Sequence, residues 1–247
     1  MAQNIYDRPD FFEGYSQLGR SVEGLAGAVE WPALRSMLPG LSGLRVVDLG
    51  CGFGWFCRWA REQGAAQVLG LDVSERMLTQ AQNATMDSAI TYKRGDLEEV
   101  ELPAAQFDLA YSSLALHYVE DLARLFAVIH RSLVPGGRLV FSTEHPIYMA
   151  PTSPGWSIDA NGRKTWPMDS YLVEGPRTTD WLTQLDFGQL CGVTERMDDA
   201  VAEGGAEFCR LACTPGDEEA LLTPELAPNR GERVSEGGPL LAVPSCS

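Results

Sequence analysis

VVDLGCGFG, at residues 46–54, is the most informative stretch of this 247-residue chain. It overlaps an apolar run, 44–49, whose β-branched residues are typical of a strand buried on both faces of a parallel sheet. Gly50 and Gly52 then let the backbone turn sharply and approach a ligand closely. A helix predicted over 55–63 would offer its N-terminal N–H groups to a phosphate or a carboxylate.

The spacing after these glycines indicates which ligand the loop serves. Asp72 stands twenty positions after Gly52, at the end of a second predicted strand, where a carboxylate can accept hydrogen bonds from two ribose hydroxyls. A dinucleotide fingerprint would need a third glycine where the chain has Trp55, which argues against a nicotinamide-dependent oxidoreductase. No Lys-Ser or Lys-Thr pair follows the glycines, so a P-loop is excluded as well. The remaining choice is a ligand with a ribose and a carboxylate.

Residues 48–54, Asp-Leu-Gly-Cys-Gly-Phe-Gly, resemble the first motif of class I S-adenosylmethionine-dependent methyltransferases. Three further segments match the family in the same order, at 71–78, 95–97 and 107–118. The similarity covers roughly residues 40–145 and is closest to the small-molecule branch that includes ubiquinone and menaquinone biosynthesis enzymes. It implies S-adenosylmethionine as cofactor and a small-molecule acceptor.

The resemblance also implies the residues that bind the cofactor. The glycine loop would contact the methionine half of S-adenosylmethionine, and Asp48 would orient the ammonium group of that half. The end of the fourth strand would lie beside the methionine carboxylate. Asp72 would hold the ribose, and the residues after the second and third strands would contact the adenosine. The full expected set is Asp48, Gly50, Gly52, Gly54, Asp72, Val73, Met77, Gly95, Asp96, Leu97, Ser112 and Ser113. Structural alternatives stay open: loop bracing for Asp48, a turn for Asp96, core packing for Met77 and a plain strand end for the two serines.

Methyl transfer from a sulfonium needs alignment of nucleophile, methyl and sulfur more than it needs an acid or a base. No catalytic side chain is therefore mandatory, and no metal site is expected. A base would help a hydroxyl or ring-carbon acceptor, and His117 and His145, both near strand ends, are the candidates. Structural roles remain open for both. A catalytically inactive protein that binds S-adenosylmethionine or S-adenosylhomocysteine is the alternative function.

Strands alternating with helices predict an α/β fold with a doubly wound, mostly parallel sheet, and the family implies seven strands in a Rossmann-like methyltransferase fold. The expected strands are 44–49, 67–71, 89–94, 107–113 and 138–143. The expected helices are 10–18, 22–38, 55–63, 74–84 and 121–133, with a Pro-Gly-Gly break at 135–137 before the fifth strand. Segments 193–202, 207–212 and 240–243 could supply the last helix and an antiparallel strand pair, or the chain could be disordered after about 214.

A single domain, 1–247, is expected, with a helical cover at 1–40 and the cofactor-binding core at 41–145. Residues 146–181 are loop-rich and hold several aromatic side chains, so they predict either a substrate cap or an extra packing layer. Residues 182–247 form an atypical acidic part.

The composition of the chain argues against several classes of binding partner. The net charge of −15 argues against nucleic acid and anionic membranes, because such binding depends largely on Lys and Arg. The six cysteines form no C-x-x-C pair, so neither a zinc site nor a disulfide framework is indicated. No apolar stretch is long enough to cross a bilayer and the start lacks a signal-peptide layout, so a cytoplasmic protein is expected. The oligomeric state stays open.

Overall fold

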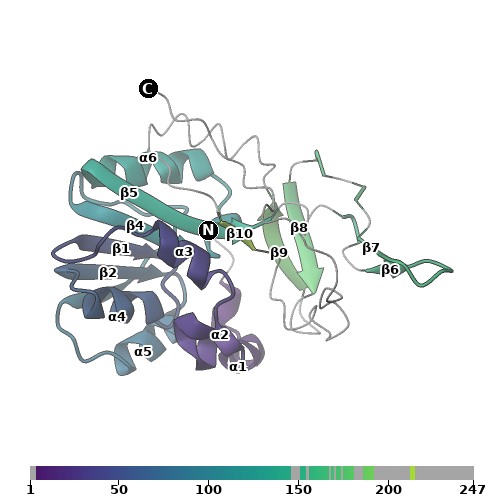
Figure 1. The fold of residues 1–247 in the computed structure, drawn as a ribbon, viewed down its shortest axis with the longest axis horizontal. Helices are drawn as coiled ribbons and strands as arrows, with labels where there is room; N and C mark the ends of the chain where they lie inside the picture. Colours follow the sequence, from purple (N-terminus) through teal and green to yellow (C-terminus); the bar gives the residue numbers. More distant parts are fainter. Residues whose placement is uncertain are drawn as a thin grey trace, which may run out of the picture.

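In a computed structural model, the protein is described at residues 4–145, 151–153, 156–166, 168–169, 171–173, 175–180, 186–191 and 212–214. Its main sheet has the strand order β10-β5-β4-β1-β2-β3, and every neighbouring pair is parallel (Figure 1). The strands are β1 (Arg45–Leu49), β2 (Gln67–Asp72), β3 (Ile90–Arg94), β4 (Phe107–Ser113), β5 (Leu133–Glu144) and β10 (Ala212–Thr214). The expected parallel α/β sheet is thus confirmed in its first five strands. A seventh strand in this sheet has no counterpart among the described residues, and 193–202 and 240–243 lie outside them.

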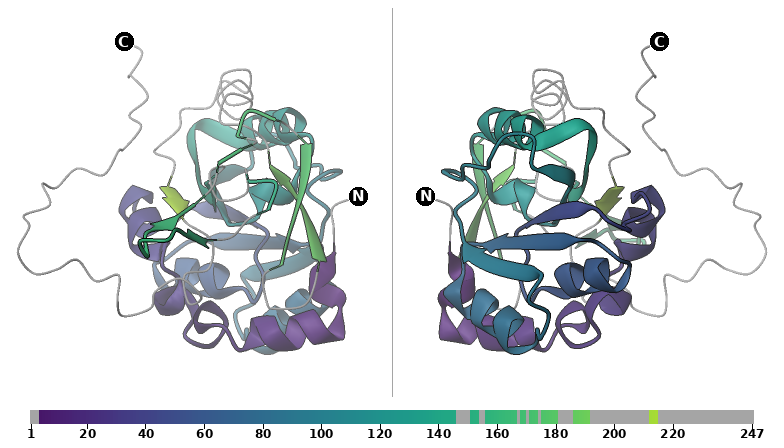
Figure 2. Two further views of the ribbon diagram at one scale, coloured as in Figure 1. Left: turned by 90° about the vertical axis from the view of Figure 1, so that its right-hand side faces the viewer. Right: turned by 90° about the vertical axis from the view of Figure 1, so that its left-hand side faces the viewer.

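Helices cover both faces of the sheet, as doubly wound topology requires (Figure 2). On one face, Val47 and Leu49 of β1 pack with the apolar side of α6 (Leu122–Ser132). On the other, Val46 packs with α4 (Trp55–Glu62), α5 (Glu75–Asn83) and α3 (Trp31–Met37). Because neighbouring strand residues point to opposite faces, one apolar strand supplies both cores.

The N-terminal cover is more broken than the sequence predicted. It consists of η1 (Ile5–Asp7), α1 (Pro9–Ser16), α2 (Gly19–Val22), η2 (Gly24–Gly27) and α3. The single helix expected over 22–38 is wrong, because Gly24 has a φ of +64° and a Cβ there would lie 2.6 Å from the Trp55 ring. Pro32, in the first turn of α3, then fits a new helix start.

The fifth strand begins earlier than expected. β5 starts at Leu133, directly after α6, so the Pro-Gly-Gly segment lies inside the strand and does not precede it. The pairing with β4 shifts register between Phe107 and Leu109, and Gly136 has a φ of +79°. A bulge therefore absorbs residues that the sequence predicted to separate helix from strand.

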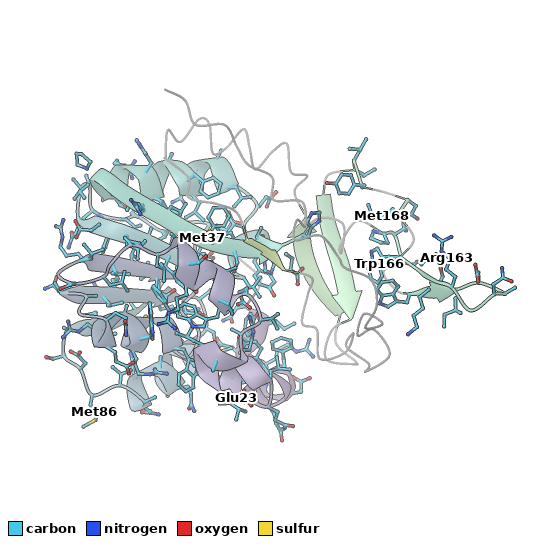
Figure 3. All side chains as sticks on the ribbon, in the orientation of Figure 1. Glu23, Met37, Met86, Arg163, Trp166 and Met168 are labelled. Atoms are coloured by element: carbon cyan, nitrogen blue, oxygen red, sulfur yellow. The ribbon has the colours of Figure 1, made fainter. Side chains whose placement is uncertain are left out.

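The segment after β5 contains two hairpins. β6 (Ser157–Ile158) pairs with β7 (Lys164–Thr165), and β8 (Gly175–Asp180) pairs with β9 (Asp186–Cys191). β9 contacts η3 (Leu116–Tyr118), whereas Trp166 and Met168 lie beyond the β8–β9 hairpin, away from the sheet (Figure 3). Within the described ranges, no helix is both long and apolar enough to cross a bilayer.

Candidate active site

A cavity lies at the carboxyl ends of the parallel strands, where ligands of doubly wound sheets bind. The first five strands contribute to it through their last residues or the loops that follow. The cavity is lined by Tyr6, Tyr15, Arg20, Gly50, Gly52, Asp72, Val73, Met77, Gly95, Leu97, Ser113, Leu114, Ala115, His117, Tyr118, Val119 and Glu144. Nine of the fourteen residues expected at the site are therefore brought together here.

The glycine loop is shaped by three left-handed backbone positions. Gly50, Gly52 and Gly54 have φ values of +79°, +50° and +70°. A Cβ on Gly50 would collide with Ala115, and one on Gly54 with the Tyr92 hydroxyl, so these two glycines allow close packing. A Cβ on Gly52 would meet nothing within 4 Å and would project into open space. Gly52 is thus the glycine that leaves room for a ligand, while Gly54 caps α4 outside the cavity lining.

Asp72 braces this loop with both carboxylate oxygens. Its Oδ2 accepts the Gly52 N–H at 2.8 Å and its Oδ1 accepts the Ser74 N–H at 2.9 Å. Burial raises the pKa of Asp72 to about 6, against the opposing effect of these amide hydrogen bonds. Each carboxylate oxygen can accept a second hydrogen bond, so a pair of ligand hydroxyls fits the remaining acceptor sites.

An apolar wall continues from Asp72. Met77 is 2% exposed and Leu97 is 8% exposed, and both line the cavity with Val73 and Gly95. Ser74 is the N-cap of α5: its Oγ accepts the Met77 N–H at 3.1 Å, which fixes the start of the helix that carries Met77. A flat, apolar ring fits against this wall.

Asp96 is not among the lining residues. Its Oδ1 accepts the Glu98 N–H at 3.0 Å, and its carbonyl accepts the Glu99 N–H at 3.0 Å. These bonds place Asp96 in a turn after β3, and its contact with the adenosine stays a prediction.

Asp48 lines a second cavity on the other side of the glycine loop, together with Gly50, Gly52 and Ser113. Its side chain is buried, and its Oδ2 accepts a hydrogen bond from the Cys57 thiol at 3.2 Å. Burial raises the pKa of Asp48 to about 7, and the neighbouring Asp72 charge adds to the rise. A cationic ligand group beside Asp48 would favour its ionised form.

The two serines at the end of β4 point in opposite directions, as neighbouring strand residues do. Ser112 is buried and donates its hydroxyl to the Leu49 carbonyl at 2.7 Å, which ties β4 to β1. Ser113 lines both cavities and donates to Glu30 Oε1 at 2.8 Å. Only Ser113 of the pair is placed to meet a ligand.

Aromatic side chains from the N-terminal cover and η3 form a further wall of the cavity, which the sequence did not predict. The Tyr6 and Tyr118 hydroxyls lie 3.2 Å apart, and the Tyr6 ring meets the Tyr15 ring edge to face. Tyr6 is held there by its neighbour Asp7, whose Oδ1 accepts Ser74 Oγ–H at 2.6 Å. The sequence predicted a cover over the ligand mouth but gave no motif for these contacts.

His117 lies in the same wall, with its ring centroid 4.3 Å from that of Tyr118. Its Nδ1 is buried and has no hydrogen-bond partner. Burial lowers the pKa of His117 to about 3, and the Arg20 charge lowers it further, so the imidazole is neutral at pH 7. His145 lines neither cavity, and burial lowers its pKa as well.

The expected substrate cap, 146–181, lies partly outside the described residues, and its role stays a prediction. Trp156 and Trp166 pack against each other with centroids 5.4 Å apart, and Trp156 is 50% exposed. Of the described residues between 151 and 173, none lines either cavity. In the same described part, no group of three or more His, Cys, Asp or Glu side chains is arranged to hold a metal ion.

These features define an α/β protein with a cavity at the carboxyl ends of the strands of a parallel sheet. The Methyltransferase domain family model matches residues 47–141. An S-adenosylmethionine-dependent methyltransferase of Mesorhizobium loti, of known crystal structure, is 63% identical, with a TM-score of 0.70 over 74% of this chain and 83% of that one. The chain belongs to the S-adenosylmethionine-dependent methyltransferases, and S-adenosylmethionine is its cofactor.

Two curated relatives add context. An uncharacterised protein of Haemophilus influenzae is 36% identical over 190 residues, which is 73% of this chain and 74% of that protein. A malonyl-[acyl-carrier protein] O-methyltransferase of Erwinia billingiae is 38% identical over 136 residues, or 54% of this chain. That match spans about half of the Erwinia protein, 53% of its length.

Proposed function

We propose that this methyltransferase acts on a small-molecule acceptor held between the donor and the wall formed by Tyr6, His117 and Tyr118. The observation that carries the proposal is that one cavity joins Asp72 and the glycine loop to this second, aromatic wall. A site for a donor alone would need no such wall. The reaction would be an in-line displacement in which alignment is the main catalytic factor.

On the donor side, Asp72 would accept hydrogen bonds from the two ribose hydroxyls through the acceptor sites that Gly52 and Ser74 leave. Met77 and Leu97 would flank the adenine ring. Gly52 would let the backbone approach the methionine half, because no Cβ fills the space there. S-adenosylmethionine supplies a methyl group activated by its sulfonium.

On the acceptor side, the buried Nδ1 of His117 would form a hydrogen bond with the acceptor's nucleophilic group. Because the pKa of His117 is about 3, its imidazole would not hold a second proton, taken from the acceptor, at pH 7. His117 would therefore orient the acceptor, and the proton would leave to solvent or to buffer. His145, which lies outside both cavity linings, has no part in this scheme.

The test is a screen for S-adenosylhomocysteine formation by the purified protein with a panel of acceptors. The panel should hold free hydroxylated, phenolic and amine-bearing metabolites, and also malonyl-[acyl-carrier protein], the acceptor named for the Erwinia relative. Turnover that depends on a free metabolite supports the proposal. Turnover with the carrier-bound acceptor alone would contradict the small-molecule assignment, and donor binding without turnover on any acceptor would contradict the acceptor wall.

A further inference from the structure

We propose that the segment around the β6–β7 hairpin binds the N-terminal cover of a second copy of this chain, so that two copies exchange arms in a symmetric dimer. The arm is described at residues 156–166, 168–169 and 171–173. It would bind a patch on the cover, formed by Val22, Glu23, Val29 and Trp55. The proposal concerns assembly, so it is independent of the acceptor that the enzyme methylates.

The first argument is the exposed apolar surface of the arm. Of the nine large hydrophobic side chains that are exposed among the described residues, five lie in the arm and are 42% to 78% exposed: Trp156, Ile158, Met168, Leu172 and Val173. None of the five lines either cavity, so they do not belong to the site described above. A hairpin of two strands is at best marginally stable in water. Such a hairpin with exposed apolar side chains indicates a surface that a partner covers.

The second argument is that the same chain carries a matching apolar patch. Val22 precedes η2 and is 63% exposed, and Val29 follows η2 and is 61% exposed. The Trp55 ring, 37% exposed, lies against Gly24 of η2. Of the nine exposed hydrophobic side chains, Met86 alone stands apart from both groups (Figure 3). The arm of one copy and the cover patch of another can therefore bury each other's apolar surface.

The third argument is that the charges of the two surfaces are opposite. Arg163 and Lys164 are exposed on the arm. The acid between 156 and 166 is Asp159, whose carboxylate accepts two backbone N–H groups of its own turn. Glu23 is exposed on the cover patch. Because each chain has a net charge of −15, two copies repel each other, and a locally positive arm on an acidic patch offsets that repulsion.

The arm and the cover patch lie too far apart to meet within one molecule. Figure 3 shows Arg163 and Trp166 at one end of the structure, beyond the β8–β9 hairpin, and Glu23 on the cover, well away from them. In a two-fold dimer each arm would bind the other copy's cover, so the contact forms twice and the assembly closes. The inner side of the same cover lines the second cavity, so the dimer would support that wall from outside.

The first test is the mass of the full chain in solution, measured by light scattering at about 1 to 100 μM protein. Wild type should show twice the 27.0 kDa of one chain. An arm variant, Trp156→Ser with Ile158→Ser, and a cover variant, Val22→Ser with Val29→Ser, should each raise the Kd of the dimer at least about 100-fold, because each loses apolar contacts twice per dimer. Met86→Ser, at a fully exposed side chain outside both patches, is the matched control and should stay dimeric.

Mixing the arm variant with the cover variant tests the exchange itself. Neither variant can form the contact with its own kind, whereas a mixed pair joins one intact arm to one intact cover. The mixture should therefore contain dimer at concentrations where each variant alone is monomeric. In a separate series, Arg163→Glu with Lys164→Glu should weaken the dimer, and adding Glu23→Lys to the same chain should restore part of the lost affinity.

Several results would overturn the proposal. One is a wild-type protein that stays monomeric over the whole concentration range, and another is a dimer that persists in the arm variant. Loss of the dimer in the arm variant with no effect in the cover variant would mean that the arm binds a different surface. If a serine variant fails to fold, the charge series decides: equal dimerisation with and without Glu23→Lys would contradict the pairing of the arm with the cover patch.

Discussion

Replacing Asp72 with alanine removes a carboxylate whose oxygens accept N–H groups from Gly52 at 2.8 Å and Ser74 at 2.9 Å. In the proposed complex each oxygen also accepts one ribose hydroxyl. Loss of two hydrogen bonds to a charged group corresponds to about 2–4 kcal/mol, or roughly 30- to 1,000-fold in Kd. The loop amides lose their partners as well, which would cost up to about 1–3 kcal/mol of stability each where water cannot replace the carboxylate.

Calorimetric titration with S-adenosylhomocysteine, with the melting temperature measured on the same sample, separates these two effects. Asp72→Asn keeps the shape and one acceptor oxygen, so its affinity should lie between those of wild type and Asp72→Ala. Glu75→Ala, a change at a 69%-exposed side chain in the next turn, is the matched control and should bind normally. A folded Asp72→Ala protein with wild-type Kd would refute the assignment of the ribose to this carboxylate.

Three further predictions follow from the same geometry. Gly52→Val should abolish S-adenosylhomocysteine binding. Gly43→Val, at another open position with φ of +78°, should lower only the free energy of unfolding, by the backbone strain of about 1–2 kcal/mol. Equal binding by the two variants would contradict the role of the glycine loop. Asp48 has a pKa of about 7 in the folded protein against an ordinary 3.8, so its contribution to stability is complete below about pH 4 and is lost as pH rises through 7. The melting temperature of Asp48→Asn should therefore rise relative to that of wild type between pH 5 and 8. Parallel curves of melting temperature against pH would contradict the raised pKa. His117→Phe should lower kcat/KM for the acceptor by about tenfold and leave the donor Kd unchanged. The pH profile of the wild-type rate should show no inflection from His117 near pH 6.5. A higher donor Kd in the variant would instead place His117 on the donor side.

The meeting of the glycine loop with Asp72 was predictable because short-range backbone requirements determine it. Gly50, Gly52 and Asp72 are readable from spacing, since a tight turn after one strand and an acid at the end of the next must meet at one edge of a parallel sheet. Ser112 and Ser113 could not be separated in the same way. Their roles depend on which of two adjacent strand residues faces the cavity.

The contacts of the N-terminal cover with the cavity were largely missed because they are tertiary contacts. Tyr6 reaches Tyr118 across 112 positions of sequence, and Arg20 is linked to β4 through Glu30 and Ser113. No local pattern marks such side chains. The error over 22–38 has a related cause: the pattern is helical, but the close approach of Trp55 to Gly24 requires a left-handed glycine that interrupts it.

A crystal structure of the protein with bound S-adenosylhomocysteine would show directly where the donor lies. We expect the ribose hydroxyls within hydrogen-bonding distance of Asp72, the adenine between Met77 and Leu97, and the thioether facing the wall of Tyr6, His117 and Tyr118. Density for the nucleoside outside this cavity, or a ribose that does not contact Asp72, would contradict it.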